Sequence, residues 1–206
     1  MISNEAEAKK YVASLCSDED FEKLEQYVSM LRDENRHQNL VAHRSLDNVW
    51  HRHIADSAQL VRYVPRETQV VLDLGSGAGL PGLIWTMIRP NDQVILVESR
   101  RRRIEWLQRV TNLLALTNCQ IFGERLENME TFHAEVITAR AFAPLPQLVA
   151  LAERFSTKGT TWVLPKGRSA AQERQKLPAR VRSLFHVEQS LTDQNAGILI
   201  GKSPPE

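Results

Sequence analysis

The stretch Val71-Leu-Asp-Leu-Gly-Ser-Gly-Ala-Gly-Leu-Pro-Gly82 decides the fold of this 206-residue chain. Its first four residues have the β-branched and apolar character of a buried strand, and they stop at glycines. Gly75, Gly77 and Gly79 allow the backbone to adopt φ values closed to other residues and to approach a ligand closely. Apolar residues follow with Pro81 close to the first helical turn, where free N–H groups bind carboxylates or phosphates. The stretch therefore predicts a strand, a ligand-binding turn and a helix.

Two acidic residues narrow the choice of ligand. Gly77, Gly79 and Gly82 also fit G-x-G-x-x-G, the dinucleotide pattern, which is weak by itself. Asp73 favours a methyl donor, S-adenosylmethionine, because its carboxylate can face the cationic end of that molecule but would repel a pyrophosphate. Glu98 ends the next strand, at the distance where an acidic residue binds ribose hydroxyls, and this contact suits both ligands. A turn whose two carboxylates merely cap helices remains an alternative.

Strands and helices alternate along the rest of the chain. Strands are expected at 69–74, 94–98, 119–122, 135–139 and 160–164, with a final pair at 181–189 and 197–202. Helices are expected at 80–88, 104–114 and 145–155. This alternation predicts an α/β protein of the Rossmann-like methyltransferase fold, with a mainly parallel seven-stranded sheet and helices on both faces.

The first 65 residues differ from the rest of the chain in their pattern, because their apolar residues repeat with helical spacing and no strand-like run occurs among them. Helices are expected at 6–13, 18–31 and 49–64, with a polar and irregular segment at 39–47. We therefore predict an N-terminal helical cap over 1–65 and an S-adenosylmethionine-binding methyltransferase domain over 66–206, forming one compact unit.

The composition indicates the cellular compartment of the protein but does not identify its binding partner. The net charge of +1 names no partner, and no apolar run approaches a membrane span of about 18 residues. The acidic, polar N-terminus is unlike a secretory signal. Cys16 and Cys119 lie far apart without metal-ligand spacing, as expected of buried thiols in a reducing compartment. These features predict a cytoplasmic protein with no membrane contact and no metal.

Taken together, these motifs resemble class I S-adenosylmethionine methyltransferases and, more narrowly, the bacterial 16S rRNA guanine-N7 methyltransferase family, also called glucose-inhibited division protein B. The likeness extends over nearly the full chain, and its most specific marks are the Leu-Pro-Gly after the glycines and the upstream His-x-x-Asp-Ser. Its motifs here are Asn39-Leu40, Arg52-His-Ile-Ala-Asp-Ser57, Leu80-Pro81-Gly82, Glu98-Ser99, Glu124-Arg-Leu-Glu127, Arg140-Ala-Phe-Ala143 and Lys166-Gly167.

The resemblance implies methyl transfer to N7 of a guanine in 16S rRNA of the small ribosomal subunit. Nothing in the sequence demands a dimer or an obligate protein partner, so we expect a monomer. The resemblance also places cofactor contacts on Gly75, Leu80, Leu126, Glu127 and Arg140. With the loop and strand-end residues, the expected cofactor set is Asp73, Gly75, Gly77, Gly79, Leu80, Glu98, Leu126, Glu127 and Arg140.

The chain departs from the family pattern at a few positions. Glu98 stands where Asp is usual, Glu34 where Trp is common, and Val41 where Thr is common. Asn195-Ala-Gly197 lacks a basic residue often found there. We expect these departures to change side-chain contacts in the cap and at the ribose, and not the reaction.

The chemistry of guanine N7 asks little of the protein, because N7 carries a lone pair and no proton. No general base is required, and the chain shows no Ser-His-Asp set and no paired acid and base. We predict positioning roles for Arg140 and Lys166, with Arg140 on guanine O6 or on the cofactor. An arginine bidentate to O6 and N7 would occupy the lone pair that must react.

Cations are expected to hold the RNA phosphates. Arg100, Arg101, Arg102 and Arg103 open a helix, where they oppose the helix dipole unless an anion is present. Lys166 and Arg168 are expected at the rim beside the cofactor loop. A solvated helix start is the alternative for the arginines.

Three alternatives to the family's reaction stay open. The chain could methylate another substrate, namely another RNA, a protein or a small molecule. It could also be a regulatory nucleotide-binding module without catalysis, or a nicotinamide dehydrogenase. His53 and Asp56 share a helical face near His51, as a structural pair or as a metal pair.

Overall fold

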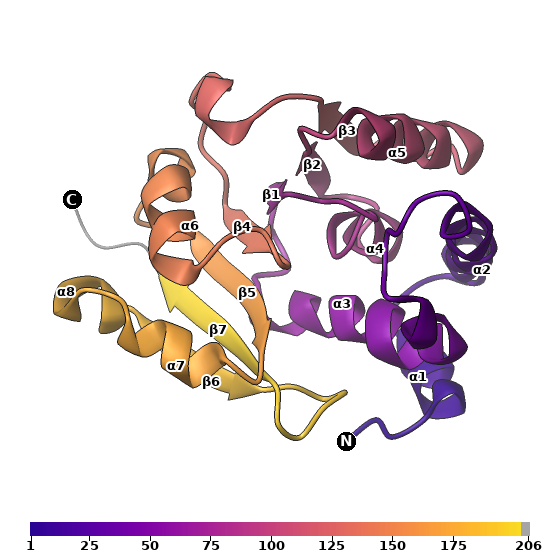
Figure 1. The fold of residues 1–206 in the computed structure, drawn as a ribbon, viewed down its shortest axis with the longest axis horizontal. Helices are drawn as coiled ribbons and strands as arrows, with labels where there is room; N and C mark the ends of the chain where they lie inside the picture. The colour runs from indigo at the N-terminus through magenta and orange to yellow at the C-terminus, as the bar shows by residue number, and fades with distance from the viewer. Residues whose placement is uncertain (203–206) are drawn as a thin grey trace.

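The computed structural model describes residues 1–202 and contains one seven-stranded sheet (Figure 1). The strand order is β3-β2-β1-β4-β5-β7-β6. The first five strands pair in parallel, whereas β7 pairs antiparallel with both β5 and β6. The strands are β1 (Val70–Leu74), β2 (Gln93–Val97), β3 (Cys119–Phe122), β4 (Val136–Ala139), β5 (Thr161–Gly167), β6 (Phe185–Gln189) and β7 (Gly197–Lys202). The predicted mainly parallel, seven-stranded sheet is confirmed.

Apolar residues on both sides of each central strand explain why helices cover both faces. In β1, Val71 belongs to one core cluster and Leu72 to the other, as expected when successive side chains point to opposite faces. The cap, α4 (Gly82–Ile88) and α5 (Arg101–Leu113) supply the first cluster. The second contains α6 (Leu145–Ala152), η5 (Glu153–Phe155), Ala170 of α7 (Ala170–Gln175) and Leu126 of η4 (Leu126–Asn128). Figure 1 shows the two groups of helices on opposite sides of the sheet.

The cap is helical, as predicted, but its helices are less regular. Asn4 and Ser17 cap α1 (Glu5–Ala13) and α2 (Asp18–Glu34) by accepting from backbone N–H groups. The single helix expected at 49–64 is instead a π-helix, η2 (Trp50–Ala55), then α3 (Asp56–Ala58) and the 3-10 helix η3 (Gln59–Tyr63). It ends before Pro65, whose ring disfavours helix at the preceding residue. The segment expected to be irregular contains a 3-10 helix, η1 (His43–Asn48).

One predicted strand was too long. Residues 181 and 182 of the strand predicted at 181–189 belong instead to the short helix α8 (Ala179–Arg182), and β6 begins only at Phe185. Pro178 explains this start, because its carbonyl accepts from the Arg182 N–H and closes a helical turn. Within residues 1–202, no helix has the length and apolar character needed to cross a bilayer. The division at residue 65 stays a prediction, although the cap and the sheet share one core cluster.

Candidate functional site

The glycine loop follows β1 and is fixed to the neighbouring strand. Gly75, Gly77 and Gly79 have φ of 66°, 57° and 96°, which confirms their predicted left-handed backbone. The N–H groups of Gly75 and Ser76 donate to the carbonyl of Val97 at 2.8 and 3.1 Å. These two bonds bring the end of β1 against the end of β2, so that the loop opens at the carboxyl edge of the sheet.

Asp73 lies beneath this loop with no exposed surface. Its Oδ2 accepts from the N–H of Gly82, the first residue of α4, at 3.1 Å. Its Oδ1 is buried without a hydrogen-bond partner among the described residues. Burial raises the pKa of Asp73 to about 7. Asp73 thus acts on the helix start in this structure, and its predicted contact with a cationic ligand stays a prediction.

The carbonyl of Ala78, in the middle of the loop, receives two side-chain donors. The hydroxyl of Tyr27 reaches it from α2 at 3.0 Å, and Nε1 of Trp106 reaches it from α5 at 2.9 Å. All three groups are buried, so both bonds are made away from water. The cap therefore positions the loop directly, a role for Tyr27 that no motif in the sequence indicated.

Glu98 is buried and holds the starts of the glycine loop and of α5. Its Oε2 accepts from the Gly77 N–H at 3.0 Å, and its Oε1 accepts from the N–H groups of Ser99 and Arg100 at 2.8 and 2.9 Å. The Glu98 carboxylate compensates the positive charge of the arginines at the start of α5, where the helix dipole makes cations unfavourable. The predicted ribose contact stays a prediction.

A cavity of about 370 Å³ opens in front of the glycine loop. Four of the predicted cofactor residues line it, namely Gly75, Glu98, Leu126 and Glu127. Gly77, Gly79, Leu80 and Asp73 lie in or behind the loop and are not among its lining residues. Val97 and Phe142 add apolar surface, and Arg100 and Arg103 add cations.

A larger cavity of about 750 Å³ adjoins the first, and residues 141–144 line both. We call this shared segment the dividing segment. Phe142 packs so closely on Gly75 that a Cβ added to the glycine would lie 2.6 Å from its ring. The charged side chains that line the larger cavity include Arg52, Asp56, Arg140, Lys166, Glu173 and Asp193.

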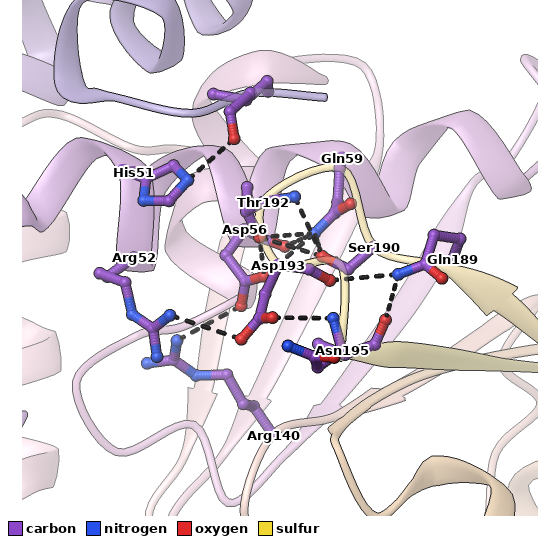
Figure 2. A network of polar contacts seen from close by, with 12 residues as sticks. His51, Arg52, Asp56, Gln59, Arg140, Gln189, Ser190, Thr192, Asp193 and Asn195 are labelled. Carbon is purple, nitrogen blue, oxygen red and sulfur yellow. Dashed lines mark hydrogen bonds and ion pairs between the residues drawn. The ribbon is translucent and has the colours of Figure 1, made fainter.

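Arg140 directly precedes the dividing segment and is fixed by the cap. Its Nη1 donates to Nδ1 of His53 at 3.2 Å and lies 4.0 Å from Oδ2 of Asp56 (Figure 2 shows Arg140 and Asp56). Because a guanidinium only donates, Nδ1 accepts and Nε2 carries the proton that reaches Ser45 Oγ at 2.6 Å. Burial, together with the charges of Arg140 and Arg52, lowers the pKa of His53 to about 3, so the ring is neutral.

His53 and Asp56 therefore flank Arg140 and do not hydrogen-bond each other, which corrects the expected structural pair. His51 points elsewhere, with its Nε2 at 3.0 Å from the carbonyl of Ile2. Among the described residues, no group of three side chains is arranged to hold a metal ion.

Lys166 is held in place by two contacts in this structure. Its Nζ donates to the carbonyl of Ala143 at 3.0 Å and pairs with Glu173 at 3.1 Å, and its side chain is only 6% exposed. These contacts fix Ala143 of the dividing segment, while the predicted positioning role of Lys166 and its predicted contact with RNA phosphates stay predictions. The exposed Arg168 follows it at the rim.

The four consecutive arginines point to different partners. Arg101 is 92% exposed and pairs with Glu105, whereas Arg102 donates to the carbonyl of His37 in the cap. Arg103 lies 3.8 Å from Glu98, and Arg100 lines the smaller cavity. The run is thus not one uniform patch, and the contact of each arginine with RNA stays a prediction.

A comparison with family models identifies the chain. The model of rRNA small subunit methyltransferase G, GidB, matches residues 20–198. The chain belongs to this family. Both core clusters and both cavities draw on the matched residues. The family predicted from the sequence motifs is confirmed.

Relatives of the GidB family cover almost the whole chain. A ribosomal RNA small subunit methyltransferase G from Erythrobacter litoralis is 54% identical over 202 residues, 98% of each chain. One from Novosphingobium aromaticivorans is 47% identical and covers 98% of this chain, which spans 89% of that relative. A ribosomal protein L11 methylase from Lactobacillus delbrueckii subsp. bulgaricus, 11% identical, superposes with a TM-score of 0.60 over 80% of this chain and 81% of its own. This structural likeness confirms the Rossmann-like methyltransferase fold.

The departure at Glu34 has a structural explanation in this GidB member. Its carboxylate accepts from Gln38 at 2.6 Å and forms an ion pair with Arg109 of α5. Where an aromatic residue is common in the family, a charged contact therefore joins α2 to α5. At the second departure, Val41 is buried and its N–H donates to Asn35 at 2.9 Å.

Titration of Asp73 should make the stability of the free protein depend on pH. The folded chain holds the Asp73 proton more tightly than the unfolded chain, because burial raises the pKa from its ordinary 3.8 to about 7. Unfolding then releases a proton between these values, so the contribution of Asp73 to the free energy of unfolding is complete below about pH 4 and is lost as pH rises through about 7. Denaturant titrations at half-unit steps from pH 4 to 8 measure this slope.

The matched variant is Asp73→Asn, which keeps an acceptor for the Gly82 N–H but does not titrate. We expect the wild type to lose stability relative to this variant as pH rises between 5 and 7. Parallel curves for the two proteins over that range would contradict the raised pKa.

Proposed function

We propose that this chain transfers the methyl group of S-adenosylmethionine to N7 of a guanine in 16S rRNA of the small ribosomal subunit. The observation that carries the proposal is the pair of adjoining cavities that share the dividing segment. One opens on the glycine loop and the other contains Arg140, and residues 141–144 line both, so a donor in one cavity would lie next to an acceptor in the other. Membership of the rRNA small subunit methyltransferase G family supports the same substrate.

The residues of the smaller cavity fit S-adenosylmethionine. The glycines with positive φ lack side chains, so the cofactor can approach the backbone of the loop. Leu126 and Phe142 offer apolar surface to the adenine base, and the carboxylates of Glu98 and Glu127 are suitable acceptors for the ribose hydroxyls. Glu127 is 43% exposed and pairs with Arg125 at the rim, so it is accessible to a ligand. S-adenosylmethionine, when bound, supplies an electrophilic methyl group on a sulfonium.

The protein's part in this reaction is to orient the guanine and exclude water. Arg140 donates to guanine O6, which leaves the lone pair of N7 free to attack. The neutral ring of His53 is engaged on both nitrogens, by Arg140 and Ser45, and therefore acts as a support for Arg140 and not as a base. Lys166 keeps the dividing segment in place through the carbonyl of Ala143.

RNA is held by cations around the cavities, and the reactive base is splayed out of its helix to enter. The exposed Arg100, Arg101 and Arg102 lie on one side and Arg168 on the other. Phosphate contacts of this kind give affinity that falls steeply with salt. We propose that the chain acts as a monomer, because the residues proposed to bind the cofactor and the guanine all come from one chain.

The decisive experiment is incubation with methyl-labelled S-adenosylmethionine and small subunits that lack the modification. We expect label in deproteinised 16S rRNA and 7-methylguanosine as the product on nucleoside analysis. Label in a protein or small molecule, another methylated nucleoside, or no transfer with tight cofactor binding would each overturn the proposal. Binding of a nicotinamide dinucleotide in place of S-adenosylmethionine would overturn it as well.

A further inference from the structure

Asp56 lines the larger cavity and is held in one orientation by its neighbours. Its Oδ1 accepts from Thr192 Oγ1 at 2.7 Å and from Gln59 Nε2 at 3.0 Å. Figure 2 shows this network, which joins the cap to the connection between β6 and β7. The side chain is 25% exposed, and no described residue donates a hydrogen bond to Oδ2. The aspartate therefore presents one fixed, unused acceptor.

Arg140 presents unused donors beside it. Its Nη1 is occupied by His53, but neither Nε nor Nη2 donates to any described residue. Since Nη1 lies 4.0 Å from Asp56 Oδ2, the cavity displays a donor group and an acceptor group side by side. Both groups are fixed before any ligand arrives, which reduces the entropy lost on binding.

We propose that Asp56 reads the Watson–Crick edge of the target guanine, with Oδ2 accepting from N1–H and the N2 amino group while Arg140 donates to O6. This inference rests on the proposed function. Guanine carries the O6 acceptor next to the N1–H donor, so the Arg140–Asp56 pair matches it. Adenine carries a donor at N6 and an acceptor at N1, so it would set donor against donor and acceptor against acceptor. Such a mismatch leaves polar groups unpaired, which makes a strong filter.

The same contact would favour the reaction itself. Methylation at N7 places positive charge on the purine and makes N1–H a stronger donor. A carboxylate on N1–H then binds the transition state more tightly than the starting base, which is the condition for raising the rate. Arg140 alone would oppose the developing charge, and Asp56 beside it offsets this.

Asp193, the other aspartate in the larger cavity, suits this role less well. Its Oδ1 accepts from the Asn195 N–H at 2.9 Å, and its Oδ2 faces Arg52 at 3.7 Å. The two aspartates are similarly exposed, at 21% for Asp193 and 25% for Asp56, but Arg52 beside Asp193 is 53% exposed, whereas Arg140 beside Asp56 is 23% exposed and is held by His53. Asp193 therefore serves as the matched control.

The test compares Asp56→Asn with Asp193→Asn on two substrates. Asparagine at 56 keeps an oxygen for Thr192 and Gln59 but puts an amino group where Oδ2 was, so the fold is preserved and the reading group is inverted. The substrates are unmodified small subunits and subunits reconstituted with one inosine at the modified guanosine. Inosine keeps N7, O6 and N1–H and lacks only the N2 amino group. Calorimetry with S-adenosylhomocysteine and thermal melting accompany the methyl-transfer assays.

We expect the wild type and Asp193→Asn to prefer guanosine over inosine about fivefold or more in kcat/KM, the effect of one hydrogen bond to a charged group. Asp56→Asn should bind S-adenosylhomocysteine normally, lose about 100-fold in kcat/KM on guanosine, and show a guanosine-to-inosine ratio below two. An unchanged ratio in Asp56→Asn, or no preference in the wild type, would refute the role of Asp56. Failure of the wild type to form 7-methylguanosine would instead refute the proposed function.

Discussion

Arg140→Ala is expected to lower kcat/KM for methyl transfer to small subunits by about 100-fold. The loss combines a charged hydrogen bond with the orientation of the base, each of which contributes on the order of tenfold or more. The guanidinium lines the larger cavity and is not among the residues of the smaller one, so the affinity for S-adenosylhomocysteine should change by less than about threefold. Initial rates with labelled S-adenosylmethionine, together with calorimetry, separate the two effects.

Arg52→Ala is the control for Arg140→Ala, because Arg52 lines the same cavity but is 53% exposed and pairs loosely with Asp193. We expect it to cost less than about fivefold, as for an exposed ion pair. Methyl transfer by Arg140→Ala within twofold of the wild type would show that the arginine does not touch the reacting base. A matching loss of cofactor affinity would move it to the cofactor site, the other contact predicted from the sequence.

Gly82→Ala should destabilise the protein by about 2–3 kcal/mol, the usual range for forcing atoms into a packed core. A Cβ on Gly82 would lie 2.2 Å from Leu96 Cδ2 and 2.6 Å from Asp73 Oδ2. The carboxylate would have to move away from the Gly82 N–H, which would leave a second buried polar group unpaired. Denaturant titration measures the free energy of unfolding, and cofactor affinity should fall with it.

Gly159→Ala provides the comparison, because Gly159 has space around it for an added Cβ. Its added Cβ would meet nothing nearer than Thr157 Oγ1, at 3.8 Å. The free energy of unfolding should stay within about 0.5 kcal/mol of the wild type. Equal effects of the two substitutions would mean that the packing between α4 and the first two strands is looser than described.

Much of the fold follows from patterns that depend on local sequence. The β-branched runs stop at glycines or turns, so most strand positions and the mainly parallel character of the sheet could be predicted. Helix type in the cap could not be predicted, because apolar spacing alone does not separate a π-helix or a 3-10 turn from an α-helix. At 181–182 the helix-starting effect of Pro178 outweighed a strand-like composition.

The motifs named several residues that the structure brings together, although their roles stay predictions. Gly75, Glu98, Leu126 and Glu127 do share one cavity, and Arg140 and Lys166 share the other. The supports were not predictable, because they arise from contacts between residues far apart in sequence. His53 reaches Arg140 across 87 positions and Tyr27 reaches Ala78 across 51. A sequence pattern alone carries no sign of either contact.

The two donors on the Ala78 carbonyl bear on where inactivating changes will occur in the gene. Inactivating substitutions should not be confined to the codons of the glycine loop, because a shift of α2 that carries Tyr27 away would loosen that loop from a distance. A shortened product beginning after the cap would retain Trp106 as an anchor on one side and would lose the other. Substitutions within α2 (Asp18–Glu34) should therefore reduce methylation gradually, in proportion to how far they displace that helix.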